Sequence, residues 1–185
     1  MEGAQIICTT LAMSTNDKLE SLVPGDIDYL IVDEACQSVE LNNLIPFEHQ
    51  PRKVILVGDQ QQLPATTFSD NAHRTKYSRS LFQRFLENGV DRVMLQVQYR
   101  MHPLIREFPS TQFYEGRLID AESVQSGLTN PTLSRIQEKW GIIRFLDLPY
   151  SKESENDTSK TNAMEVDLIT ALLQQIVKDQ RIHIN

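Results

Sequence analysis

Four short, uninterrupted apolar runs constrain the fold of this chain more than any other feature. They are "QIICTT" (5–10), "DYLIVD" (28–33), "KVILVG" (53–58) and "RVMLQV" (92–97). Their apolar residues are contiguous rather than alternating, which is typical of strands that are covered on both faces in a parallel sheet. The runs therefore predict buried parallel strands, with connectors between them that lie on the faces of the sheet.

Helical patterns lie between these runs and after them. Residues 78–89 place Leu81, Phe82, Phe85 and Leu86 on one helical face, and Asn88-Gly89 closes the predicted helix. A turn is expected at Pro24-Gly25, ahead of the second run. Strands that alternate with helices indicate an α/β fold with parallel sheets.

The pattern changes after residue 97. A short helix is predicted within 102–116, beginning at Pro103, with His102 in a capping or packing role. Residues 141–148 resemble another strand. Residues 150–161 have too few apolar side chains to pack and are predicted to form a solvated linker. The last five residues, "RIHIN", resemble the opening of a strand.

A long helix is predicted after this linker. Asn162 is in the N-cap position and Glu165 lies three residues later, which is the spacing of a capping box. The helix carries an apolar stripe that we expect to be buried in a core, consisting of Val166, Ile169, Leu172, Leu173, Ile176 and Val177.

Composition narrows the class of protein. The net charge is −7, with −5 in residues 1–97 and −2 in 98–185, so neither half is basic enough to predict nucleic-acid binding by charge alone. A local basic groove is still compatible with this balance. The two cysteines lack the spacing of a zinc site or a disulfide framework. No apolar run approaches the ~20 residues of a membrane span, so we expect a soluble, intracellular protein.

Polar clusters follow three of the four predicted strands. They are Asp33-Glu34-Ala35-Cys36-Gln37, residues 58–64 ("GDQQQLP") and residues 98–103 ("QYRMHP"). Ligands of open α/β sheets bind beyond the carboxyl ends of the strands. If the strands are parallel neighbours, all three clusters lie at one edge of the sheet.

Together these clusters contain the residue types that nucleoside-triphosphate hydrolysis needs. Asp33 can hold Mg²⁺, and Glu34 can take a proton from the attacking water. Gln62 can contact the terminal phosphate, and Arg100 can neutralise the charge that develops on it. A magnesium ion also explains why two adjacent carboxylates follow an apolar strand, because a cation beside them offsets their mutual repulsion.

In these motifs the sequence resembles the superfamily 1 helicases, in the branch of senataxin and the nonsense-mediated decay helicase. "DEACQ" resembles the Walker B box, "VGDQQQLP" the third motif, and "QYRMHP" the start of the second motor domain. Supporting matches are "IICTTLAMS" (6–14), "SLFQRF" (80–85) and "FPSTQFYEGRL" (108–118). The resemblance covers roughly residues 5–120, and the helix that follows Asn162 more loosely.

The resemblance implies an ATP-driven motor with two RecA-like domains that moves 5′→3′ on single-stranded RNA or DNA. Residues 1–97 would then be the C-terminal part of the first domain, and residues 98–185 the N-terminal part of the second. The implied cofactors are ATP and Mg²⁺. A nuclear location follows from the likeness to senataxin alone.

The resemblance also assigns roles to individual residues. Asp33 and Glu34 bind Mg²⁺ and activate water, while Gln62 and Arg100 contact the γ-phosphate. Tyr99 stacks on adenine, and Gln37 belongs to the nucleotide-binding set. Contacts to the nucleic-acid backbone are implied for Thr9 and Thr10.

The chain also departs from the family pattern. The phosphate-binding sequence Gly-x-x-x-x-Gly-Lys-Ser/Thr occurs nowhere in it, the family's later motifs are missing, and Ala65 replaces a proline of the third motif. We therefore expect a fragment of a helicase that is inactive by itself. The alternative is a truncated, non-catalytic paralogue that acts as a binding or regulatory module.

Structural roles are alternatives at each of these positions. The pair Asp33-Glu34 could be a solvated strand end, and Arg100 could form a structural ion pair with Glu34 or Asp59. Gln62 alone would be a surface glutamine, and Tyr99 could pack in a core. Two threonines at a strand end, Thr9 and Thr10, are as compatible with structure as with function. Cys36 has no basic neighbour in sequence and is expected to be inert.

Overall fold

The computed structural model describes residues 4–20, 27–128, 130–156 and 159–180. The chain forms two compact units, Met1–Met94 and Leu95–Asn185. That these units are parts of two RecA-like domains, divided at 97/98, stays a prediction. The expected turn at Pro24-Gly25 and the strand-like end at 181–185 lie outside the described residues.

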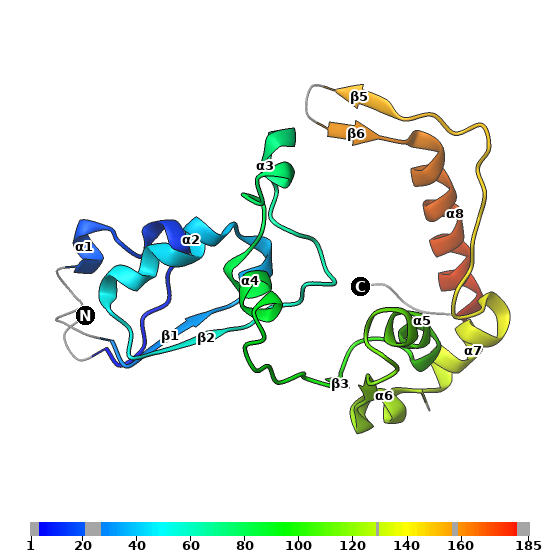
Figure 1. Cartoon of the computed structure of the whole chain (residues 1–185). Helices are drawn as coiled ribbons and strands as arrows, with labels where there is room; N and C mark the ends of the chain where they lie inside the picture. Colours follow the sequence, from blue (N-terminus) through cyan, green and yellow to red (C-terminus); the bar gives the residue numbers. More distant parts are fainter. Residues whose placement is uncertain (1–3, 21–26, 129, 157–158, 181–185) are drawn as a thin grey trace. The chain divides into compact units, whose positions relative to one another are not determined.

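The first unit contains a parallel pair of strands. β1 (Tyr29–Val32) pairs with β2 (Lys53–Leu56), and the register runs from Tyr29 opposite Lys53 to Val32 opposite Leu56. Figure 1 shows the two strands side by side. Two of the four predicted strands and their parallel direction are therefore confirmed.

The prediction that both faces of these strands are buried is wrong. Val32 is buried, but Tyr29, Ile31 and Ile55 on the opposite face are exposed, with 63% of Ile31 accessible to solvent. Side chains alternate across a strand, so one face of the pair packs on the unit's core while the other stays bare. Among the described residues, no element covers that second face.

Three other strand predictions fail because strands need partners. Residues 5–10 are irregular and exposed, and residues 141–148 form no strand. Of the run 92–97, only Val97 is in a strand, β3 (Val97–Gln98), which pairs in parallel with β4 (Ile119–Asp120) of the second unit. Strand formation depends on pairing and burial more than on local propensity. The three polar clusters therefore do not end strands of one sheet.

The first unit also contains short helices. The 3₁₀ turns are η1 (Leu11–Met13), η2 (Ala35–Gln37) and η3 (Ile45–His49), and the α-helices are α1 (Asp17–Glu20), α2 (Glu40–Leu44), α3 (Asp70–Arg74) and α4 (Leu81–Glu87). The core of this unit lies beneath η2, the turn that follows β1. The buried hydrophobic residues of this unit are Val32, Ala35, Cys36, Val39, Ala65, Ala72 and Leu81.

Helix α4 ends where its sequence predicts, and a side chain caps its start. The Ser80 hydroxyl accepts a hydrogen bond from the Gln83 amide at 3.1 Å, so Ser80 caps the first turn. At the other end, the Gly89 amide donates to the Leu86 carbonyl and the Val90 amide to the Phe85 carbonyl. This pair of bonds is a Schellman motif, which needs the positive φ of Gly89.

The second unit is mostly helical. Its helices are α5 (Pro103–Phe113), α6 (Glu122–Gly127), α7 (Pro131–Trp140) and α8 (Ala163–Gln180). The Nδ1 atom of His102 accepts a hydrogen bond from the Leu104 amide at 3.2 Å, which confirms its capping role. Asn162 caps α8: its side-chain oxygen accepts from the Glu165 amide, and its side-chain nitrogen donates to the Glu165 carboxylate.

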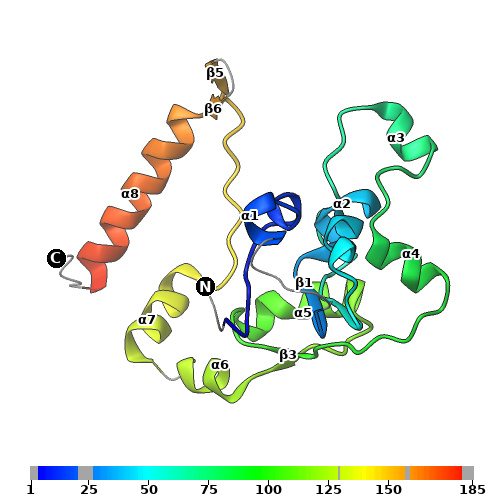
Figure 2. The same ribbon diagram turned by 90° about the vertical axis from the view of Figure 1, so that its left-hand side faces the viewer.

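Two expectations for the end of the chain are corrected. Part of the predicted linker forms an antiparallel hairpin, in which β5 (Ser154–Asn156) pairs with β6 (Ser159–Thr161). The apolar stripe of α8 is not buried, because Val166, Ile169 and Leu173 are exposed. Figure 2 shows α8 extending away from the other helices of its unit. The helix packs against α7, where Lys139 pairs with Asp179.

Candidate functional site

The turn after β1 presents two carboxylates to solvent. Asp33 and Glu34 are both exposed. Glu34 adopts a left-handed conformation, with φ of 52° and ψ of 37°, and its amide donates to the Asp33 carboxylate at 3.0 Å. Left-handed backbone is uncommon for residues other than glycine and tends to cluster at functional sites. This conformation turns the chain sharply from the strand into η2.

Gln37 is hydrogen-bonded to the second of these carboxylates. Its side-chain amide donates to Glu34 Oε2 at 3.1 Å. No described residue donates a hydrogen bond to the other oxygen of this carboxylate, Oε1, which is therefore available to water or a ligand. The bond restricts the rotamers of Glu34 without neutralising its charge.

The loop after β2 holds a third carboxylate. One oxygen of Asp59 accepts from the Gln61 amide at 3.0 Å, and the other accepts from the Gln62 side chain at 3.0 Å. Gln62 is exposed, so its amide lies at the surface of the loop in an orientation that Asp59 sets. The position that sequence analysis selected for a phosphate contact is thus held in place by a neighbouring carboxylate.

These two loops meet at one edge of the β1–β2 pair. The Ala35 amide donates to the Val57 carbonyl at 2.8 Å, and the Val57 amide donates to the Val32 carbonyl at 2.8 Å. Cys36 is buried where the two loops meet, and burial raises the pKa of its thiol to about 11. The negative charges of Asp59 and Glu34, one from each loop, raise this pKa further. The thiol therefore stays protonated at neutral pH, in agreement with the expectation that Cys36 is inert.

Gly58 permits this close approach. A Cβ atom at position 58 would lie 3.0 Å from Cys36 Sγ, 3.1 Å from the Cys36 amide and 3.3 Å from the Ala35 amide. Two of these three atoms belong to the backbone, so a side chain could not be accommodated without separating the loops.

We predict that Gly58→Ala destabilises the chain by about 1–3 kcal/mol, the usual cost of overpacking a tight contact. Urea unfolding followed by circular dichroism measures this change, and hydrogen exchange of the Ala35 and Val57 amides shows whether it is local. The matched control is Gly127→Ala in α6, where no atom lies within 4 Å of the new methyl group. An equal effect of both substitutions would contradict the close approach.

Sequence analysis missed Asn43, which anchors the turn that carries Glu34. This residue is fully buried in α2, and its side-chain nitrogen donates to the Ala35 carbonyl at 3.0 Å and to the Ser38 carbonyl at 3.4 Å. The only sign of this role in the sequence is an asparagine among apolar residues, in "LNNLIPF" (41–47). That pattern does not indicate which carbonyl groups the asparagine binds. Asn43 holds both ends of η2 and so positions the residues on either side.

The third polar cluster, residues 98–103, lies in the second unit. The side chain of Gln98 forms hydrogen bonds that hold this loop. Its side-chain oxygen accepts hydrogen bonds from the Arg100 amide at 2.8 Å and the Met101 amide at 2.6 Å. Its side-chain nitrogen donates to the Met101 carbonyl and to Asp120, each at 2.7 Å. The loop that carries Arg100 is therefore fixed at its base by one side chain.

Asp120 anchors this arrangement to α5. Arg106 donates two hydrogen bonds to its carboxylate, each 3.0 Å long, in the bidentate geometry of strong ion pairs. The bonds from Arg106 and then Gln98 hold the pKa of Asp120 below its ordinary value. A lowered folded-state pKa adds stability above the unfolded value of about 3.9, and that stability is lost as pH falls through the folded value.

The remaining candidate residues are accessible to solvent. Tyr99 and Arg100 are exposed, so Tyr99 is not a core residue. Thr9 and Thr10 are exposed ahead of η1, and the Thr9 hydroxyl donates to the Thr10 carbonyl at 3.4 Å. Their roles toward a nucleotide or a nucleic acid stay predictions.

The donor set after β1 suits a magnesium ion that is shared with phosphates. Within the described part of the chain, no group of three or more acidic, histidine or cysteine side chains could enclose a metal. Mg²⁺, however, commonly binds through one or two carboxylates and completes its shell with water and phosphate oxygens. The exposed carboxylate of Asp33 fits that requirement. In the same part of the chain, no helix is both long and apolar enough to cross a membrane.

Comparison with known proteins places both units in one family. Residues 1–70 match a family model described as an AAA domain, and residues 77–183 match a second model of that description. A probable helicase of Dictyostelium discoideum is 43% identical over 155 residues, which is 84% of this chain. The probable helicase MAGATAMA 3 of Arabidopsis thaliana is 38% identical over 96% of the chain, and the helicase SEN1 of Saccharomyces cerevisiae is 36% identical over 95%.

The chain spans only part of the length of these relatives. It covers 16% of the Dictyostelium protein, 22% of the Arabidopsis protein and 8% of the yeast protein. AAA domains have the fold of the P-loop nucleoside triphosphatases, which is consistent with the parallel strand pairs seen here.

Proposed function

Because the chain belongs to the superfamily 1 helicases, in the branch that contains Sen1 and senataxin, we propose that it is a segment of an ATP-dependent 5′→3′ helicase for single-stranded RNA or DNA. The observation that carries this proposal is the shared edge of β1 and β2. There, the turn with Asp33 and Glu34 packs against the loop with Asp59 and Gln62. Carboxylates and a glutamine amide at the ends of parallel strands suit the hydrolysis of a nucleoside triphosphate.

Each residue of this edge has a role in the proposal. Asp33 holds the magnesium ion of the nucleotide, and that ion neutralises charge on the β- and γ-phosphates. Glu34 accepts the proton of the attacking water, and Gln37 holds the Glu34 carboxylate in position. Gln62 contacts the γ-phosphate, and Asp59 orients its amide.

Two residues of the second unit also have roles in the proposal. Arg100 stabilises the negative charge that develops during phosphoryl transfer, and Tyr99 stacks on the base. The Gln98 amide keeps the loop of these two residues in one conformation, through its bonds to the Arg100 and Met101 amides. In the same proposal, Thr9 and Thr10 contact the nucleic-acid backbone without reading its sequence. We infer a nuclear location from the likeness to senataxin.

The 185-residue chain should not hydrolyse ATP by itself, because its sequence contains no Gly-x-x-x-x-Gly-Lys-Ser/Thr loop to hold the β- and γ-phosphates. The test compares this chain with the full-length gene product in a steady-state ATPase assay. We expect the full-length protein to hydrolyse ATP faster when single-stranded RNA or DNA is added, and the short chain to show no hydrolysis. A full-length product that binds nucleic acid without hydrolysing ATP would support the non-catalytic alternative instead.

A further inference from the structure

The loop that carries Arg100 has little support from its own backbone. Residues 99–101 lie between β3 and α5 and belong to no helix or strand. Among the described residues, no hydrogen bond between two backbone groups involves any of these three. The hydrogen bonds described for their backbone come from the side chain of Gln98, which accepts from the Arg100 and Met101 amides and donates to the Met101 carbonyl. The conformation of the loop therefore depends on where the Gln98 side chain is held.

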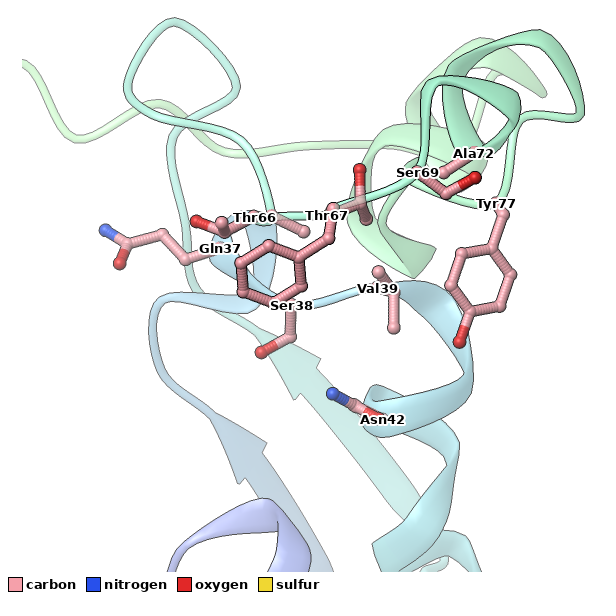
Figure 3. A pocket seen from close by; sticks show the side chains of 11 residues that line it. Gln37, Ser38, Val39, Asn42, Thr66, Thr67, Ser69, Ala72 and Tyr77 are labelled. Atoms are coloured by element: carbon pink, nitrogen blue, oxygen red, sulfur yellow. The ribbon is translucent and has the colours of Figure 1, made fainter.

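The turn after β1 is supported in a different way. Asn43, which holds both ends of η2, is fully buried, so the side chains packed around it fix its position. Figure 3 shows that the end of η2 borders a hollow of about 390 Å³, lined in part by Gln37 and Ser38, so the support of this turn comes from Asn43 and not from that side. Gln98, by contrast, is only half-buried. Packing alone does not fix its amide, and a bonded partner is needed.

Asp120 of β4 is the partner of the Gln98 amide. Its Oδ1 atom accepts a hydrogen bond from the Gln98 side-chain nitrogen at 2.7 Å, and its side chain is only 8% exposed. A carboxylate that has lost most of its water needs a cation beside it. Arg106 of α5 is that cation, and each oxygen of Asp120 accepts one of its two hydrogen bonds. The bonds from Arg106 and Gln98 keep the pKa of Asp120 below its ordinary value, so the carboxylate stays charged at neutral pH.

We propose that Arg106 and Asp120 are positioning residues for phosphoryl transfer, acting through the amide side chain that holds the Arg100 loop. The inference rests on the proposed function, in which Arg100 stabilises the charge that develops on the transferred group. A bidentate arginine–carboxylate pair fixes direction as well as distance. The pair therefore ties the Gln98 amide to α5, and the amide ties the Arg100 backbone to β3.

Full-length protein that carries Asp120→Ala is expected to have a kcat for nucleic-acid-stimulated ATP hydrolysis about 10–100-fold below wild type, because displacement of a catalytic group by ~1 Å can cost about 100-fold. The matched control is Asp179→Ala. Asp179 of α8 also accepts hydrogen bonds from a cation, Lys139, and from a glutamine amide, Gln175. No hydrogen bond in the described part of the chain joins it to residues 98–101, so its replacement should leave kcat unchanged.

A double variant separates positioning from a general loss of structure. In an Arg100→Gln background, Asp120→Ala should lower kcat by less than about twofold further, because the side chain that it positions is already absent. A purely structural defect would lower kcat by the same factor in both backgrounds. Arg106→Lys keeps the charge but not the planar fork, so its kcat should lie between those of wild type and Asp120→Ala. This milder variant also serves if Asp120→Ala does not fold.

Hydrogen exchange, followed by mass spectrometry on the 185-residue chain, tests the same contacts without catalysis. Peptides that contain the Arg100 and Met101 amides should exchange about fivefold faster in Asp120→Ala, the factor that corresponds to the net free energy of one hydrogen bond. The same peptides should exchange at the wild-type rate in Asp179→Ala.

Two results would overturn the proposal: unchanged exchange of the Arg100 loop in Asp120→Ala, or a loss of kcat that is equally large with and without the Arg100 side chain. Failure of the proposed function would look different. An Arg100→Gln protein with the kcat of wild type would remove the catalytic role of Arg100, whereas the exchange experiment would still report whether Asp120 holds the loop.

Discussion

Full-length protein that carries Glu34→Gln is expected to hydrolyse ATP about 10³-fold more slowly than wild type, within the range that general-base catalysis supplies. Glutamine has nearly the shape of glutamate and its carbonyl can still accept the hydrogen bond from Gln37, but it cannot take a proton from water. The loss should therefore appear in kcat, with KM for ATP changed less than about twofold, because binding does not require the proton transfer.

The control for this variant is Glu48→Gln. Glu48 is another exposed glutamate of the first unit, in η3, and its replacement should leave kcat unchanged. Nucleic-acid-stimulated hydrolysis, measured at saturating ATP, gives the comparison. Equal kcat values for wild type and Glu34→Gln would remove Glu34 from the mechanism, and Asp33-Glu34 would then be a solvated strand end.

Arg100→Gln is the second substitution with a large expected effect, a fall in kcat of about 10³-fold or more, since an arginine that stabilises phosphoryl transfer is worth about 10³–10⁵. Arg100→Lys should recover little of this activity. Lysine retains the charge but lacks the planar fork that contacts two phosphate oxygens at once. The backbone of the loop should not change in either variant, because Gln98 binds the Arg100 amide rather than its side chain.

The matched control for Arg100 is Arg135→Gln, which removes an exposed arginine from α7. This comparison also tests the structural alternative, in which Arg100 pairs with Glu34 or Asp59. An ion pair of that kind would lower the free energy of unfolding when it is broken, so urea denaturation is measured beside kcat. Loss of stability with kcat preserved would contradict a catalytic role.

Helix ends that are capped by residues close in sequence could be predicted from the sequence alone. The Schellman end of α4 at Gly89, the His102 cap of α5 and the Asn162–Glu165 cap of α8 all occur where the sequence predicts them. In each case the interacting groups are five residues apart or fewer. The strands β1 and β2 were also predicted, because each has a parallel partner within the first unit.

The strand predictions at 5–10, 92–97 and 141–148 failed for a nonlocal reason. An apolar run indicates that a segment can form a strand. The strand forms only where another segment pairs with it through hydrogen bonds and other side chains pack against its apolar face. The apolar stripe of α8 failed as a burial prediction for a similar reason. Amphipathic spacing indicates which side chains of a helix share one face, but it does not identify a segment that would cover that face. Partners of this kind lie far away in the chain.

The sequence by itself determined which residues are candidates for the chemistry and in what order: two carboxylates after one strand, a glutamine after the next, and an arginine at the start of the second unit. Only the tertiary structure decided which of them share an edge and which side chains hold them there. Gly58 against Cys36, Asn43 beneath the Glu34 turn, and Asp120 beneath the Arg100 loop each join residues that are separated along the chain. Such contacts depend on how the backbone folds back on itself, and no local pattern encodes them.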